Sequence, residues 1–133
     1  MKAAIYEEFN GPISVQDVPI PTISADGVLI QVQATGVCRS DWHGWKGHDD
    51  DVKKVGLPFC PGHEFSGLVV QCGKNVRRFQ PGDKVALPFI LSCGRCHHCD
   101  DDRPTVCAHQ EQPGFTQWGS FAEYVAIPRA DRN

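Results

Sequence analysis

The sequence has little positive charge and no basic cluster. Its 133 residues include 13 Lys and Arg against 16 Asp and Glu, which gives a formal net charge of −3 at pH 7. Proteins that bind nucleic acid usually present a basic patch or stripe to the phosphate backbone. We therefore expect no nucleic-acid partner.

Long apolar runs are also missing. The longest uninterrupted run, residues 85–91, contains Pro88 and is far shorter than the roughly 20 residues that span a bilayer. The N-terminal segment is apolar only briefly before Glu7 and Glu8, so no signal peptide is visible. We expect a cytoplasmic protein with no membrane partner, in a reducing compartment where cysteines serve as metal-bound thiolates.

Glycine and proline are plentiful, with 13 and 10 residues, and they separate short apolar segments along the chain. A short helix is expected from Ser40 or Asp41 toward Trp45, and the polar segment 47–55 is expected to be an exposed loop. Many short strands with little helix predict one small, mainly β barrel. The expected strands lie at residues 2–6, 13–18, 28–35, 66–72, 84–87 and 121–127.

The segment 28–35 shows the clearest strand pattern. Its apolar residues at positions 30, 32 and 34 alternate with polar ones, so we expect a half-buried strand that delivers Cys38 at its end. Further along the chain, Gly62 and Gly67 allow the backbone around His63 to turn tightly and pack closely.

Four cysteines follow the spacing C-x2-C-x2-C-x7-C, which suits a loop that wraps a tetrahedral ion. Segment 92–108 lacks a core of its own, so a structural zinc would supply its folding energy. The chief rival is an iron–sulfur cluster, but the bacterial ferredoxin run closes with a shorter gap and a Cys-Pro pair that is missing here. His97 and His98 are expected to face solvent. The four ligands are Cys93, Cys96, Cys99 and Cys107.

Cys38 and His63 form a second pair of candidate ligands. Cys38 follows one expected strand, and His63 precedes another. Two ligands do not make a stable site, because a catalytic zinc usually has three protein ligands plus a water or substrate. The spare thiols, Cys60 and Cys72, are interpreted as small buried hydrophobic residues. The sequence therefore offers no compelling third ligand.

These motifs resemble those of the zinc-dependent medium-chain alcohol dehydrogenases. The similar stretches are Cys38-Arg39-Ser40-Asp41-Trp42-His43, Gly62-His63-Glu64-x2-Gly67-x5-Gly73-x2-Val76 and the four-cysteine lobe. The opening Met1-Lys2-Ala3-Ala4 and the closing Gly119-Ser120-Phe121-Ala122-Glu123-Tyr124 are similar too, so the resemblance covers essentially the whole chain. It implies that residues 1–133 form the family's catalytic domain, a mainly β, GroES-like, partly open β-barrel with short helices and a zinc-binding lobe at 92–108.

The family's coenzyme-binding Rossmann domain, with its G-x-G-x-x-G turn, does not occur in this sequence. The resemblance implies a catalytic-domain fragment of an enzyme that oxidises a zinc-bound alcohol to an aldehyde or ketone by hydride transfer to NAD or NADP. We expect the third zinc ligand outside this sequence and expect the fragment alone to be inactive. The full-length enzyme is expected to be a homo-oligomer that acts on a small alcohol or aldehyde.

By this resemblance, Cys38 and His63 are ligands of the catalytic zinc, and Glu64 is an acidic residue behind the metal that can exchange onto it. Ser40 would hydrogen-bond the alcohol oxygen and pass its proton toward His43, whose imidazole can accept it. Without the resemblance, Ser40 reads as a helix cap and His43 as a surface histidine.

Asp41 fits a residue that orients a ligand, and a capping role suits it nearly as well. Arg39 resembles a residue that contacts the coenzyme phosphate, with a surface ion pair as the alternative. Phe89 and Trp45 resemble walls of the substrate pocket, which favours a small or slim alcohol. Packing in the core or at the rim is expected for Trp42, Phe59, Phe115 and Trp118.

The alternative function is a structural zinc-binding GroES-like module with no catalysis of its own. The combination of Cys38, Ser40, His43 and His63 argues against it, because a purely structural protein does not need these residues together. A co-chaperonin function, by analogy of the barrel alone, is weaker still, because such proteins need neither metal motif.

Overall fold

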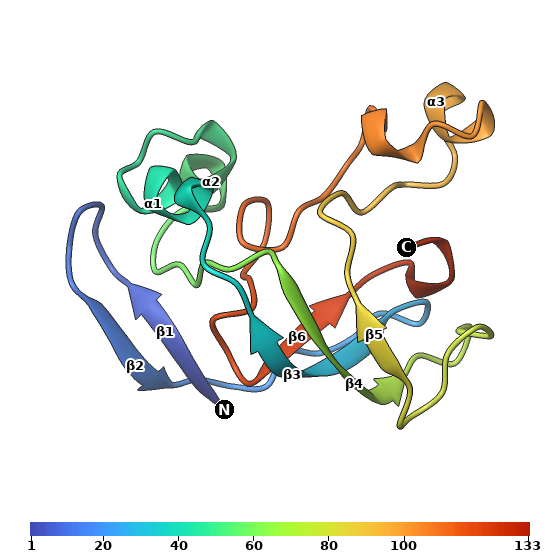
Figure 1. Ribbon diagram of the computed structural model, residues 1–133, viewed down its shortest axis with the longest axis horizontal. Coiled ribbons are helices and arrows are strands. Elements are labelled where there is room, and N and C mark those ends of the chain that lie inside the picture. Colours follow the sequence, from blue (N-terminus) through green and yellow to red (C-terminus); the bar gives the residue numbers. More distant parts are fainter.

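Two antiparallel sheets form the framework of the protein, and the computed structural model describes all of residues 1–133 (Figure 1). The smaller sheet pairs β1 (Lys2–Tyr6) with β2 (Ile13–Asp17). The larger sheet has the strand order β5-β4-β3-β6. Neither sheet closes on itself, so the mainly β, partly open architecture is confirmed. The larger sheet consists of β3 (Val28–Thr35), β4 (Phe65–Cys72), β5 (Lys84–Ala86) and β6 (Tyr124–Ile127).

The helices are short. They are α1 (Arg39–Trp45), α2 (Asp50–Val55) and α3 (His97–Asp100), with 3-10 turns η1 (Pro104–Val106) and η2 (Ala130–Arg132). In Figure 1, α1 and α2 lie together near one end of the β1–β2 sheet, whereas α3 lies on an arm that extends away from both sheets. None of the helices has the length and apolar character needed to cross a membrane.

Helix α2 corrects the expectation that residues 47–55 form an exposed loop. The Asp49 carboxylate accepts hydrogen bonds from the backbone N–H groups of Asp51 and Val52, at 2.9 and 3.0 Å, and so caps the helix. Val52 is fully buried against Tyr6 and Phe59. One cap and one buried contact stabilise a helix that is too short and too polar to show an apolar period in the sequence.

The alternation expected for β3 holds only in part. Leu29 and Ile30 are both buried, and Ala34 is exposed. The pairing with β4 shifts register between Leu29 and Ile30 and again between Val32 and Ala34, and such bulges turn side chains away from simple alternation. Strand β6 pairs only with the first half of β3, which leaves the second half less covered.

The core has two main parts. One, with eight buried residues, lies on the larger sheet and includes Ile30, Val69 and Val125. The other lies beneath α1 and α2 and consists of Tyr6, Val52, Phe59 and Phe115. This second cluster supports the α1 segment, from which several of the candidate site residues come.

Close backbone packing between β3 and β4 depends on Gly67. A Cβ atom at this position would collide with the carbonyl oxygen of Gln31 and lie 2.7 Å from Cγ2 of Ile30. The two strands therefore pack closely at Gly67, as the sequence predicts for this glycine.

We expect Gly67→Ala to lower the free energy of unfolding by about 3 kcal/mol, because the new methyl group meets backbone that cannot move aside without breaking the sheet. Gly82→Ala is the matched control: a Cβ there has nothing within 4 Å, and only its φ of +99° is unfavourable for alanine. The control should cost about 1 kcal/mol. Urea unfolding of the zinc-saturated proteins measures both, and equal losses would contradict the steric argument.

Candidate functional site

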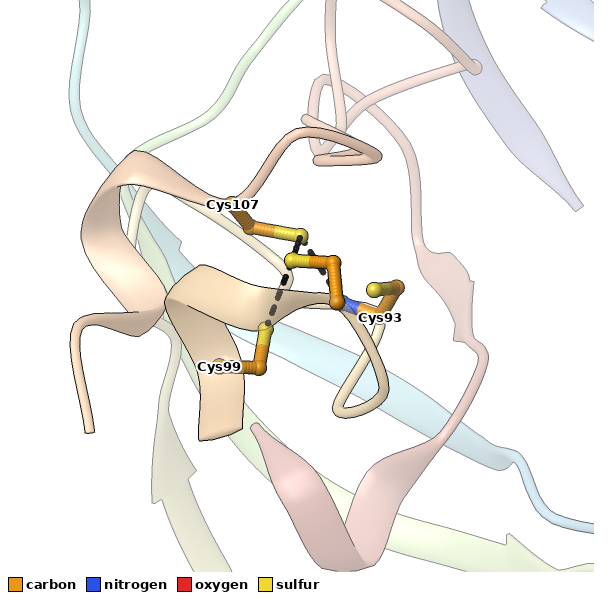
Figure 2. Close-up of side chains that lie close together, drawn as sticks. Cys93, Cys99 and Cys107 are labelled. Carbon is orange, nitrogen blue, oxygen red and sulfur yellow. Dashed lines mark hydrogen bonds between the residues drawn. The ribbon is translucent and has the colours of Figure 1, made fainter. Parts of the chain in front are cut away.

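The four cysteines of the lobe converge on one point. Figure 2 shows the side chains of Cys93, Cys99 and Cys107 gathered close together. The sulfur of Cys96 lies 3.6 Å from that of Cys99 and 3.8 Å from that of Cys107, and all four sulfurs lie within 4.8 Å of one another. A tetrahedral zinc with Zn–S bonds of about 2.3 Å holds its sulfurs about 3.8 Å apart. The spacing therefore fits a single tetrahedral ion, and it is too long for disulfides.

Backbone amides favour the thiolate form at two of these cysteines. The N–H groups of Cys99 and Ala108 lower the pKa of Cys96 to about 6, and the N–H of Arg95 lowers the pKa of Cys93. Burial raises the pKa of Cys107, because the thiolate loses contact with water there. A bound cation would offset that cost, so the donor set suits a metal ion.

The lobe is closed at its base by backbone pairing. Leu91 and Glu111 exchange two N–H···O bonds of 2.8 and 2.9 Å. Between them, α3 starts directly after Cys96, and Gly94 takes a left-handed φ of +69°. His97 is exposed, as expected, whereas His98 is partly buried and its Nδ1 has no hydrogen-bond partner. The backbone pairing of Leu91 with Glu111 therefore joins the two ends of the lobe, and an ion bound by the cysteines would hold its tip together.

The second group of potential ligands comes from two chain segments. Cys38 lies between β3 and α1, and His63 and Glu64 directly precede β4. Their ligand atoms all lie within 4.8 Å of one another, with His63 Nε2 4.0 Å from an oxygen of Glu64. The structure thus brings together Cys38, His63 and Glu64, as the sequence predicts. His63 is buried, Cys38 is half-buried and Glu64 is exposed, so the group opens toward solvent on one side.

Asp41 holds this group in place through three hydrogen bonds. One carboxylate oxygen accepts the backbone N–H of Cys38 at 2.9 Å. The other accepts the N–H of Gly62 at 3.0 Å and lies 3.1 Å from Nδ1 of His63. A carboxylate accepts and does not donate, so Nδ1 carries the proton and the Nε2 lone pair is left for a metal. Asp41 therefore both caps α1 and orients His63, which combines the two roles considered from the sequence.

Gly62 makes this arrangement possible. Its φ is +102°, and a Cβ atom there would lie 2.6 Å from Oγ of Ser120 and 2.8 Å from the backbone nitrogen of Phe121. Only glycine combines this φ with so close an approach, and the resulting turn directs the Gly62 N–H toward Asp41.

Ser40 does not cap α1, contrary to the interpretation from its residue type alone. Its hydroxyl donates to the sulfur of Cys38 at 3.1 Å and lies 3.3 Å from Nε2 of His63. The hydroxyl therefore lies beside two of the candidate ligand atoms, where a proton can be passed to or from a group bound there.

His43 lies apart from Ser40, with which it shares no hydrogen bond. Its exposed ring places Nδ1 3.1 Å from Nδ1 of His48, a residue that the sequence analysis did not consider. The H-x4-H spacing was the only signal for this pair, and it is weak. Arg39 is exposed and makes no ion pair; its guanidinium lies 5.2 Å from the ring centroid of Trp42.

Two phenylalanines border His63. The Phe89 ring, 44% exposed, lies 5.2 Å from the His63 ring between centroids, and the buried Phe115 ring lies at 5.1 Å. Phe115 therefore belongs both to the core and to the wall of the site, which no sequence pattern indicated. The indole N–H of Trp45 donates to the carbonyl of Gly11 at 2.7 Å, and its ring packs on the core cluster around Tyr6.

The remaining thiols are not close to either group. Cys60 is fully buried, and burial raises its pKa to about 12, so it stays a neutral, unreactive thiol. Cys72 is partly buried in the core of the larger sheet, with its sulfur 3.5 Å from the carbonyl oxygen of Phe79. Both are small packing residues.

Comparison with known proteins shows the family to which this chain is similar. The family described as "Alcohol dehydrogenase GroES-like domain" matches residues 24–132. An alcohol dehydrogenase of Moraxella sp. (strain TAE123) is 40% identical over 126 residues, which cover 94% of this chain and 37% of that protein. The chain thus spans less than two fifths of that relative's length.

Solved structures show the same fold. The crystal structure of an NAD-dependent alcohol dehydrogenase superposes with a TM-score of 0.89 at 32% identity, over 98% of this chain and 38% of that one. The cobalt- and zinc-bound thermostable alcohol dehydrogenase of Pyrobaculum aerophilum gives a TM-score of 0.85 at 28% identity, over 96% and 39%. The chain therefore belongs to the GroES-like domain family of the zinc-dependent medium-chain alcohol dehydrogenases.

Proposed function

We propose that this chain is the catalytic domain of a zinc-dependent alcohol dehydrogenase, which oxidises a small alcohol to an aldehyde or ketone with NAD or NADP. The observation that carries the proposal is the convergence of Cys38, His63 and Glu64, with their ligand atoms within 4.8 Å. A module whose zinc is only structural needs the four-cysteine lobe and has no use for this second, solvent-open group.

The residues of this group fit a catalytic zinc. Cys38, His63 and, by exchange, Glu64 would hold it, and the bound ion would supply Lewis-acid polarisation of the substrate hydroxyl. Asp41 fixes the tautomer of His63, so that Nε2 carries no proton and its lone pair would be available to the ion. The rings of Phe89 and Phe115 lie beside His63 and would form an apolar border of the site.

Ser40 is the residue best placed to move the substrate proton. Its hydroxyl can accept a hydrogen bond from the alcohol while donating its own proton to a second acceptor. His43 would take the proton on the solvent side of α1. The Ser40 and His43 side chains are not in contact, so a bridging hydroxyl or water is needed between them.

The remaining parts of the enzyme would come from outside these 133 residues. The coenzyme domain and the third zinc ligand would belong to that part. Within this chain, Trp45 remains a predicted wall of the substrate pocket. The exposed guanidinium of Arg39 is available to a coenzyme phosphate. By the same family argument, the complete enzyme is a homo-oligomer.

We predict one tightly held zinc per chain, bound by the lobe. Cys96→Ser should lose this zinc and unfold or aggregate, because the ion supplies the folding energy of the lobe. Cys38→Ser should keep both the zinc and the fold. Atomic emission measures the zinc content and circular dichroism the fold; equal stability of the two variants would contradict the division into structural and catalytic ligands.

The open group should bind Co²⁺ added to the zinc-loaded chain, with a thiolate-to-cobalt absorption band that Cys38→Ser abolishes. We expect Asp41→Asn to weaken this binding roughly 10- to 100-fold, because an amide no longer fixes the His63 tautomer. Asp131→Asn is the control, since that carboxylate accepts backbone N–H bonds far from the group. A wild-type chain that shows no such band would count against the proposed catalytic site.

We also expect no NAD- or NADP-dependent alcohol oxidation by this chain alone. No G-x-G turn occurs in the sequence to hold a coenzyme pyrophosphate, so the hydride acceptor has no dedicated site. The absorbance of the reduced nicotinamide coenzyme at 340 nm measures turnover. Sustained turnover by the purified chain would show that the coenzyme site is not where we place it.

A further inference from the structure

Two exposed histidines outside the proposed zinc site face each other, each through its Nδ1 atom. His43 lies in the last turn of α1, and His48 lies between α1 and α2. Their Nδ1 atoms are 3.1 Å apart, and both side chains are open to solvent. The proposed reaction gives His48 no role.

The backbone places the two histidines together. The N–H of His48 donates to the carbonyl of His43 at 2.9 Å, and the N–H of Gly47 donates to that of Gly44 at 2.9 Å. Gly47 has a φ of +70°, which lets the chain reverse direction at the end of the helix. Because the backbone fixes the spacing, bringing the rings together on a ligand costs little conformational entropy.

The geometry points to a binding site for a borderline divalent cation, Zn²⁺, Ni²⁺ or Cu²⁺, held by Nδ1 of His43 and Nδ1 of His48, with water in the other positions. Imidazole nitrogens are preferred ligands of these ions. With metal–nitrogen distances of about 2.0–2.1 Å, two ligand nitrogens lie about 2.9 Å apart in a square plane and about 3.4 Å apart in a tetrahedron. The observed 3.1 Å lies between these values.

Binding of an ion by the neutral pair requires a change of tautomer in one of the two rings. In the metal-free pair, one Nδ1–H donates to the lone pair of the other Nδ1. On binding, the donor ring carries its proton on Nε2 instead, so that both Nδ1 lone pairs face the ion.

The nearby charges are positive and oppose the binding of any divalent cation, so only ions that bind imidazole strongly can occupy the pair. The Arg39 guanidinium and the Lys46 ammonium lie 5.2 and 5.7 Å from the centroid of the Trp42 ring, beside the pair. The site therefore depends on chelation by two nitrogens and not on acidic neighbours. Ca²⁺ and Mg²⁺, which prefer oxygen ligands, should not bind.

Occupation of this site would block proton release by His43, a consequence that rests on the proposed function. An ion on Nδ1 holds the proton of His43 on Nε2, so neither nitrogen can accept another. The pair would then act as an inhibitory metal site. The binding itself does not depend on the proposed reaction and can be tested separately.

Trp42 provides a built-in reporter for the test. Its ring centroid lies 4.9 Å from that of His43 and 5.6 Å from that of His48, so paramagnetic Ni²⁺ bound there should quench its fluorescence. The zinc-loaded chain carrying Cys38→Ser, which removes a ligand of the other open group, is titrated with Ni²⁺. We expect saturable quenching that Ca²⁺ does not produce. Trp42→Phe should abolish the quenching while calorimetry still detects the binding.

His48→Gln in the same background should raise the dissociation constant for Ni²⁺ roughly 100-fold, because a single imidazole remains. His109→Gln is the matched control and should leave it unchanged, since only the backbone N–H of this exposed residue contacts the lobe. Equal dissociation constants for His48→Gln and its parent, or the absence of saturable quenching, would overturn the inference. Either result would leave the Co²⁺ test of the Cys38 group unaffected.

Discussion

The carboxylate of Asp41 is the contact on which the geometry of the proposed active site depends. Its three acceptor bonds join Cys38, at the start of α1, to Gly62 and His63, more than twenty positions later. The antiparallel pairing of β3 with β4 brings the two segments near each other, since Thr35 lies opposite Phe65. The strand pairing brings the two segments close together, and Asp41 then fixes the positions of the ligand atoms that could share an ion. Because Asp41 is only 7% exposed, water cannot easily replace it in this role.

The two groups of potential ligands differ in what holds them. Cys93, Cys96, Cys99 and Cys107 come from one short loop with almost no apolar core, so an ion there adds to the stability of the fold. Cys38 and His63 come from two strand ends that rest on packed side chains and on Asp41, so this group is preformed without an ion. A preformed site with one open side can exchange ligands without unfolding, which catalysis requires and a structural site does not.

The grouping of the potential metal ligands could be predicted from the sequence because it is encoded in local spacing. The four-cysteine lobe, the Cys38 and His63 segments and most of the strands fall into this class. Features that depend on tertiary contacts could not be predicted: α2 needs the burial of Val52, the bulges of β3 need its partners, and Phe115 reaches His63 only in the folded chain. For Ser40, the residue type alone suggests a helix cap. The fold instead directs its hydroxyl toward the sulfur of Cys38 and the imidazole of His63.

In the proposed reaction, the placement of residues along α1 would separate metal chemistry from proton exchange. Asp41 is buried and directed toward His63, Ser40 borders the open group, and His43 lies one helical turn further on, exposed to solvent. Residues three apart on a helix lie on neighbouring turns of one face, so Ser40 and His43 can serve the same path without touching. In the proposed reaction, a proton that leaves the buried side would cross that gap through a bridging group and reach a histidine whose Nδ1 faces His48. Under the proposed function, the state of the His43–His48 pair would therefore decide whether the outer end of the path can accept a proton.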